Sequence, residues 1–195
     1  DYKLSTQMDH MYLNPNYNYT NGGLSLRLGY QKISRDFQSD FPFQTASENT
    51  QVELFNKYVF NNRIYTVVGT LIQKNYADYQ QGQQTTQSDF FANVVTEFTD
   101  QIRINFGGRW NSHSNYGSHF TYSLNPSIQI FDENQSSLKF QGAYSTAFIA
   151  PSLYQLFDPF SGNLDLQPEE NTSFEIGFVY KLKKWELSGT YFNRI

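Results

Sequence analysis

The chain has 195 residues, of which 18% are aromatic and only 16% are charged, and its formal net charge is -4. Disordered segments are poor in aromatic residues, so this composition indicates a folded chain and favours β structure. The acidic balance offers no basic surface to nucleic acid, and the lack of cysteine excludes disulfides, thiolate chemistry and most structural zinc sites.

Apolar and polar residues alternate along most of the chain, which is the pattern of strands with one apolar and one polar face. In the segment IRINFGGRWN, Ile102 and Ile104 share one face with Trp110, whereas Arg103 and Arg109 lie on the other. Many such segments approach the roughly 9 to 11 residues that a tilted strand needs to cross a bilayer. The predicted strands cover residues 2–12, 18–35, 49–60, 64–77, 88–98, 102–112, 119–131, 137–147, 172–181 and 185–195.

The predicted connections alternate between short and long. The expected short turns are 14–16, 61–63, 99–100, 132–136 and 181–184, and the expected longer loops are 36–48, 78–87, 113–118 and 148–171. Outer-membrane barrels have short turns on one rim and long loops on the other. The alternation therefore predicts an all-β fold, namely an antiparallel transmembrane β-barrel segment with meander topology.

The final part of the chain carries the most specific pattern. The run GAYSTAFIAPSLYQLF, followed by GNLDLQPEENTSFEIGFVY and WELSGTYFNRI, closely resembles the late barrel strands of TonB-dependent outer-membrane receptors. In that family a strand ending in Phe, Ala and Pro leads to a loop with Gly-Asn and Pro-Glu, and a strand containing Glu follows. The matching residues are Gly142, Phe148, Ala150, Pro151, Ser152, Leu153, Leu156, Gly162, Asn163, Leu164, Leu166, Pro168, Glu169, Glu175 and Gly177.

This resemblance implies both an architecture and a function. The family has a plug domain inside a 22-stranded barrel and imports iron-siderophore complexes or cobalamin with energy passed through TonB. It implies an outer-membrane protein of a Gram-negative bacterium, which is not an enzyme and whose partners are membrane lipid, its own plug, TonB and the ligand. On this interpretation residues 1–195 supply about ten strands from the C-terminal half of the barrel and are an internal fragment without the plug.

Five charged residues are expected to face the barrel interior, because Arg or Lys near the midplane of the lipid face costs about 2 to 4 kcal/mol. They are Arg103, Arg109, Lys139, Glu175 and Glu186. These side chains could pair with the plug or with one another, or could simply form a solvated polar surface. The residues expected against lipid include Leu24, Leu26, Leu28, Ile102 and Ile104.

Ligand contacts in the family come from the outer loops and the upper surface of the plug. Aromatic side chains in the predicted outer loops are therefore the candidates for ligand binding, with packing within the loops as the alternative. These candidates are Phe37, Phe41, Phe43, Tyr79, Tyr154, Phe157 and Phe160.

No catalytic residue, cofactor or metal site is indicated by a motif. Asp36 with Asp40, or Asp158 with Asp165, could offer oxygen ligands to Ca²⁺. Neither pair follows the spacing of a calcium loop, so no metal is expected.

Two other architectures share part of the pattern. A complete outer-membrane barrel of about eight to ten strands, with a hydrolase or adhesin role, would need a histidine beside a nucleophile or acidic partners at a rim. The Ser112-His113 pair permits that hypothesis without supporting it, and His119 could approach His113 across a loop. A soluble β-sandwich binding module would also show alternating strands.

Overall fold

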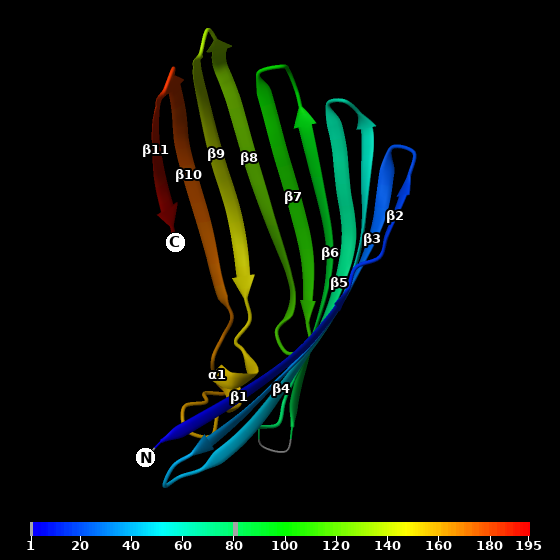
Figure 1. Cartoon of the computed structure of the whole chain (residues 1–195), viewed down its shortest axis with the longest axis vertical. Helices are drawn as coiled ribbons and strands as arrows, with labels where there is room; N and C mark the ends of the chain where they lie inside the picture. The colour runs from blue at the N-terminus through cyan, green and yellow to red at the C-terminus, as the bar shows by residue number, and fades with distance from the viewer. Residues whose placement is uncertain (1, 80–81) are drawn as a thin grey trace.

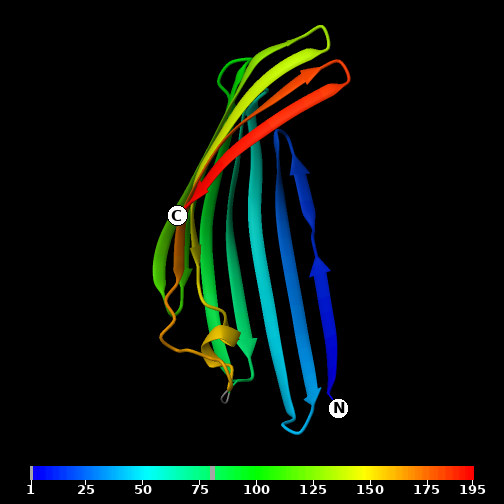
Figure 2. The ribbon, with the colours of Figure 1, turned by 90° about the vertical axis from the view of Figure 1, so that its left-hand side faces the viewer.

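The computed structural model describes residues 2–79 and 82–195, and in these residues all strands form one antiparallel sheet. The sheet is strongly curved and resembles part of a barrel wall (Figure 1 and Figure 2). Successive strands are neighbours along the sheet, which confirms the predicted meander and leaves no second sheet for a sandwich. The strands are β1 (Lys3–Leu13), β2 (Asn16–Tyr19), β3 (Gly22–Gln38), β4 (Phe43–Asn61), β5 (Ile64–Ala77), β6 (Gln83–Glu97), β7 (Ile102–His113), β8 (Gly117–Glu133), β9 (Ser136–Ile149), β10 (Glu169–Leu182) and β11 (Trp185–Arg194).

The first edge of the sheet differs from the prediction. β1 and β2 pair with β3 in one continuous register, from Lys3 opposite Gln38 to Tyr19 opposite Gly22, so no turn occurs at 14–16. Pro15 interrupts this strand because proline cannot donate to a ladder, and an edge strand tolerates that loss. The chain reverses at residues 20–21 instead, where Asn21 has a positive φ of 64°.

The predicted outer loops 36–48 and 78–87 are also shorter than expected. β3 and β4 continue into a hairpin connected only by residues 39–42, and β6 already begins at Gln83. The Asp78 carboxylate accepts hydrogen bonds from the Ala46 amide at 2.8 Å and the Thr45 hydroxyl at 3.0 Å, which fastens the end of β5 to β4. These segments lack the alternation of a half-buried strand, so the sequence pattern did not identify them as strands.

The two faces of the sheet are chemically different. Residues directly opposite each other on adjacent strands project from the same face. One such row joins Val94, Phe106, Leu124, Tyr144 and Phe174 on five consecutive strands, and all five side chains are at least partly exposed. We call this apolar surface the outward face. It continues across five strands, whereas apolar side chains on the surface of a soluble protein are mostly isolated.

The opposite surface, here called the inner face, is covered at one end by the loop between β9 and β10. This loop contains the helix α1 (Leu153–Phe157), whose first turn is capped reciprocally by Ser152 and Gln155. Leu153 and Leu156 are buried where α1 packs on β5 and β6. Among the described residues, no helix has the length and apolar character needed to cross a membrane.

Gly69 leaves room for two aromatic side chains on the inner face. It lies opposite Phe55 on β4 and Phe91 on β6, and a Cβ atom at Gly69 would be 2.6 Å from atoms of both side chains and 2.7 Å from the Leu54 carbonyl oxygen. We therefore expect Gly69→Ala to lower the free energy of unfolding of the intact protein by about 1 to 3 kcal/mol, measured by urea titration in lipid.

Gly142→Ala is the matched control, because its Cβ would have no neighbour closer than 3.5 Å. An equal loss of stability in both variants would show that the contacts around Gly69 are not the cause.

Candidate functional site

The loop of residues 150–168 is shaped by its own side chains. One carboxylate oxygen of Asp158, Oδ1, accepts hydrogen bonds from the Phe160 amide at 3.1 Å, the Ser161 amide at 2.9 Å and the Ser161 hydroxyl at 2.9 Å. Burial alone would raise the pKa of Asp158, but these three hydrogen bonds favour the ionised form and the net pKa is lowered. Asp158 is therefore a structural anchor of the loop.

Contacts with the hairpin between β7 and β8 hold the far end of the same loop. The Tyr116 hydroxyl donates to the Leu166 carbonyl at 3.2 Å, and a ring nitrogen of His119 lies 2.9 Å from the Tyr116 carbonyl oxygen. The other ring nitrogen of His119 lies 3.2 Å from the Glu170 carboxylate, and the ring stacks on Phe148 at 3.7 Å. The loop is thus fixed at several points over the inner face.

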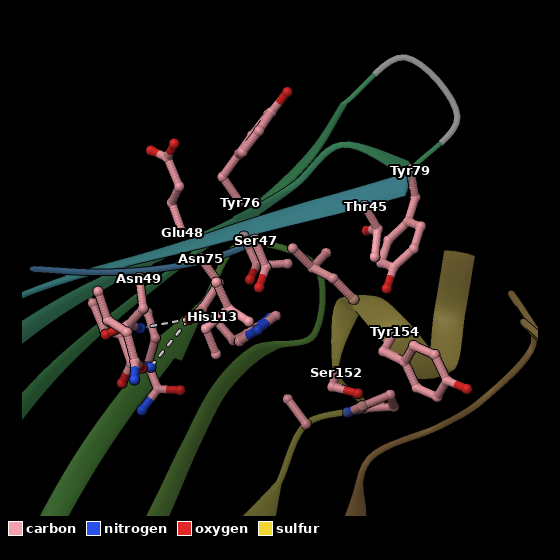
Figure 3. Close-up of a pocket in the computed structure, with 18 of the residues that line it drawn as sticks. Thr45, Ser47, Glu48, Asn49, Asn75, Tyr76, Tyr79, His113, Ser152 and Tyr154 are labelled. Atoms are coloured by element: carbon pink, nitrogen blue, oxygen red, sulfur yellow. Dashed lines mark hydrogen bonds between the residues drawn. The ribbon is translucent and has the colours of Figure 1, made fainter. Parts of the chain in front are cut away.

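Beneath this loop lie two adjoining cavities of about 590 and 440 Å³. Both are lined by Arg35, Thr45, Tyr79 and Tyr154, so we treat them as one feature and call it the rim groove. Figure 3 shows Tyr79 from the end of β5 and Tyr154 from α1 facing the same space. Its size is in the range of sites for small molecules.

Five of the seven predicted ligand candidates line the rim groove. Phe37, Phe43 and Phe160 form a chain of rings with centroid separations of 5.7 and 5.8 Å, and the centroids of Tyr79 and Tyr154 are 6.4 Å apart. These rings come from three segments that are distant in the sequence.

The two remaining candidates lie elsewhere. Phe41 is 80% exposed at the tip of the β3–β4 hairpin, and Phe157 is half-buried outside the residues that line the groove.

The floor of the rim groove is polar and comes from the inner face of the strands. The side-chain Nδ2 of Asn49 donates to the side-chain Oδ1 of Asn75 at 2.7 Å, and the side-chain Nε2 of Gln73 donates to the same atom at 3.2 Å (Figure 3). Glu48 and Tyr76 project from the other side of the ribbon, as the figure shows. An amide floor beneath aromatic walls can hydrogen-bond a ligand while the rings contact its apolar parts.

Sequence reasoning missed the most buried charge of the inner face. The side chain of Asp89 is fully buried and accepts hydrogen bonds from Asn111 at 2.7 Å and Gln87 at 3.2 Å. Arg109, one of the predicted interior residues, completes this cluster. Its Nη1 lies 3.3 Å from the Asp89 carboxylate, and its Cζ lies 5.5 Å from the centroid of the Phe91 ring. Only the odd position of Asp89, directly before the outward-facing Phe90, signals its direction in the sequence.

The other four predicted interior residues share the inner face by register. Arg103 lies opposite Glu97, Lys139 opposite Val179 and Glu175 opposite Ala143. Glu186 forms an ion pair with Lys181 at 3.3 Å. The structure thus places all five on one face but brings only Arg109 into a buried cluster.

The hypotheses of a calcium site and a hydrolase find little geometric support. Asp158 is occupied by loop hydrogen bonds, and the described residues contain no group of three or more His, Asp or Glu side chains suited to a metal ion. Ser112 and His113 are adjacent on β7, so their side chains project from opposite faces of the sheet.

The family model for TonB dependent receptor-like β-barrels matches residues 1–194. The chain belongs to this family. A TonB-dependent receptor barrel is an outer-membrane structure of Gram-negative bacteria, and this chain is located there.

Individual relatives agree with this family. The vitamin B12 transporter BtuB of Vibrio cholerae is 29% identical over 175 residues, which cover 85% of this chain and 28% of that transporter. An iron-regulated outer membrane virulence protein of the same species is 31% identical over 96 residues, which cover 42% of this chain and 13% of the relative. The chain thus spans less than a third of the curated relatives that it matches.

Solved structures show the same fold at low sequence identity. The siderophore receptor PirA from Acinetobacter baumannii superposes with a TM-score of 0.88 at 16% identity, covering 98% of this chain and 35% of that one. A variant of the ferric enterobactin receptor PfeA from Pseudomonas aeruginosa superposes with a TM-score of 0.86 at 15% identity. The match covers 97% of this chain and 34% of that receptor. The strands of this TonB-dependent receptor barrel therefore follow a known barrel wall.

The lowered pKa of Asp158 predicts how the loop of this TonB-dependent receptor barrel responds to pH. A carboxylate whose pKa is lower in the folded state contributes stability above its unfolded pKa of about 3.9, and this stability is lost as pH falls through the folded value. We expect the loop to stay closed down to about pH 4 and to open below it. Hydrogen exchange of residues 150–168, corrected for the intrinsic effect of pH, measures this opening.

Asp158→Ala is expected to open the same loop at neutral pH, with exchange about 5 to 30 times faster, because three donors lose their acceptor. Asp165→Ala is the control, since Asp165 is an exposed residue of the same loop. Unchanged exchange in Asp158→Ala would contradict the anchoring role.

Proposed function

We propose that the chain forms part of the barrel wall of a receptor that takes up iron-siderophore complexes or cobalamin, with energy supplied through TonB. The observation that carries this proposal is the family match over residues 1–194, together with the relationship to a vitamin B12 transporter over 85% of the chain. The rim groove fits the proposal because it lies among the loops, where a scarce ligand would first be captured.

The edges of the sheet support a larger barrel around this segment. In the described part of the chain, β1 with β2 and β11 each pair on one side only. Unpaired backbone groups are costly in lipid, so spanning sheets close into barrels. We propose that further strands of the same receptor complete the wall.

The polar inner face is proposed to surround a plug domain. Arg103, Lys139, Glu175 and Glu186 lie on this face with part of their surface open. In this arrangement they would contact the plug or water inside the barrel, and lipid would contact the outward face.

The test is uptake by the bacterium that carries the intact receptor. A strain lacking the receptor is expected to lose uptake of labelled cyanocobalamin or of one ferric siderophore, and a plasmid copy is expected to restore it only while the inner membrane is energised. Uptake that is unchanged by deletion, or restored without TonB, would argue against the proposal. An adhesin or hydrolase built from the same barrel would show neither effect.

A further inference from the structure

Within the described residues, the rim groove contains one cation that has no charged partner. Arg35 projects from the inner face, opposite Thr6 on β1 and Thr45 on β4, and lines both cavities of the groove. Among the described residues it forms no ion pair, whereas Arg27 is paired with Glu53 and Arg109 with Asp89. An unpaired guanidinium beside aromatic walls is suited to bind an anionic group with two hydrogen bonds.

The segments around the groove are otherwise acidic. In residues 31–49, 73–87 and 148–171, which supply most of the lining, the carboxylates are Asp36, Asp40, Glu48, Asp78, Asp158, Asp165, Glu169 and Glu170, and the cations are Lys32, Arg35 and Lys74. Lys32 pairs with Glu48 at 3.1 Å on the outward face, and Lys74 projects from that face too, opposite Thr50 and Thr86. Arg35 is thus the one of these three cations that faces the groove, and the segments as a whole carry a net negative charge.

We propose that the rim groove selects a bulky, ring-bearing ligand of low net charge that presents a single anionic group, such as a phosphodiester or carboxylate, to Arg35. The aromatic walls of Phe43, Tyr79 and Tyr154 contact the rings of the ligand, and the amides of Asn49 and Asn75 hydrogen-bond its polar edge. A ligand with several negative charges would meet this one cation while the surrounding segments carry a net negative charge, so it binds weakly. This inference rests on the proposed function and narrows its ligand class.

The test uses the purified intact receptor and three probes: cyanocobalamin, which carries one phosphodiester, a trianionic ferric tricatecholate and a neutral ferric trihydroxamate. Wild-type receptor is expected to bind cyanocobalamin most tightly. Arg35→Gln is expected to raise the Kd for cyanocobalamin about tenfold or more, because the anionic group loses its charged partner. Arg35→Lys, which keeps the charge but loses the paired donors, is expected to give an intermediate Kd.

Lys74→Gln is the matched control, since it removes the same charge from the outward face of β5, two strands from Arg35, and its Kd is expected to change less than about twofold. Tightest binding of either ferric probe, or an unchanged Kd in Arg35→Gln, overturns the inference but leaves the proposed uptake function intact. Failure of the wild-type receptor to bind any of the three probes overturns both. Unaltered migration of the unheated variants in gels shows that their barrels are folded.

Discussion

Leu124→Arg is expected to destabilise the intact receptor in lipid by about 2 to 4 kcal/mol. Leu124 lies on the outward face, in register with Phe106 and Tyr144, near the middle of the apolar stretch of β8. A guanidinium at this depth loses its hydration and has no partner on the apolar rows around it. Urea unfolding of the refolded receptor in bilayers measures the effect.

Asn125→Arg is the control for this substitution because it is one residue along the same strand and projects from the inner face, opposite Asn105. We expect it to cost less than about 1 kcal/mol, since the polar face remains hydrated. Phe120→Arg, on the outward face but closer to the rim, is expected to fall between the two. Equal losses at positions 124 and 125 would show that the two faces do not differ as the register indicates.

Asp89→Ala is expected to lower the free energy of unfolding by about 2 kcal/mol, because the buried carboxylate accepts hydrogen bonds from Asn111, Gln87 and Arg109. Removing one partner of a buried ion pair often costs more. Here the Arg109 side chain is 47% exposed and can recover hydration, which reduces the loss. The same urea titration applies.

A double-mutant cycle with Arg109→Ala separates the ion pair from the rest of the cluster. Glu97→Ala is the matched control, because Glu97 is an exposed residue of β6 with the same inward direction. A loss in Asp89→Ala no larger than in Glu97→Ala would mean that the cluster does not stabilise the wall.

The sequence predicted the membrane-spanning parts of the strands well, because there the two faces meet different surroundings. Ile102, Ile104 and Phe106 alternate with Arg103 and Asn105, and the register places these sets on opposite faces. Where the strands continue beyond the apolar rows, the alternation fades. The ends of β3 and β4 were therefore predicted as a loop.

The rim groove could be predicted only as a set of candidates. Aromatic loop residues were recognisable individually, but the approach of Phe43 to Phe160 depends on a fold that brings together residues more than a hundred positions apart. Arg35 lies in a polar stretch without a motif, and its importance appears only when its neighbours and the pairing of the other cations are known. The turn at 14–16 was wrong because Pro15 is compatible with both a turn and an edge strand.

The rim groove is built entirely from one contiguous stretch of the chain, from the β1 residue Leu4 to Ser161 in the loop after α1. β1 and β2 both pair with β3, and each later strand in that stretch pairs with its neighbour in sequence, so the stretch contains its own internal pairing. A single genetic exchange between two receptors could therefore transfer the walls and floor of the groove together. The contribution of this wall to ligand selectivity would then pass between lineages as one inherited block.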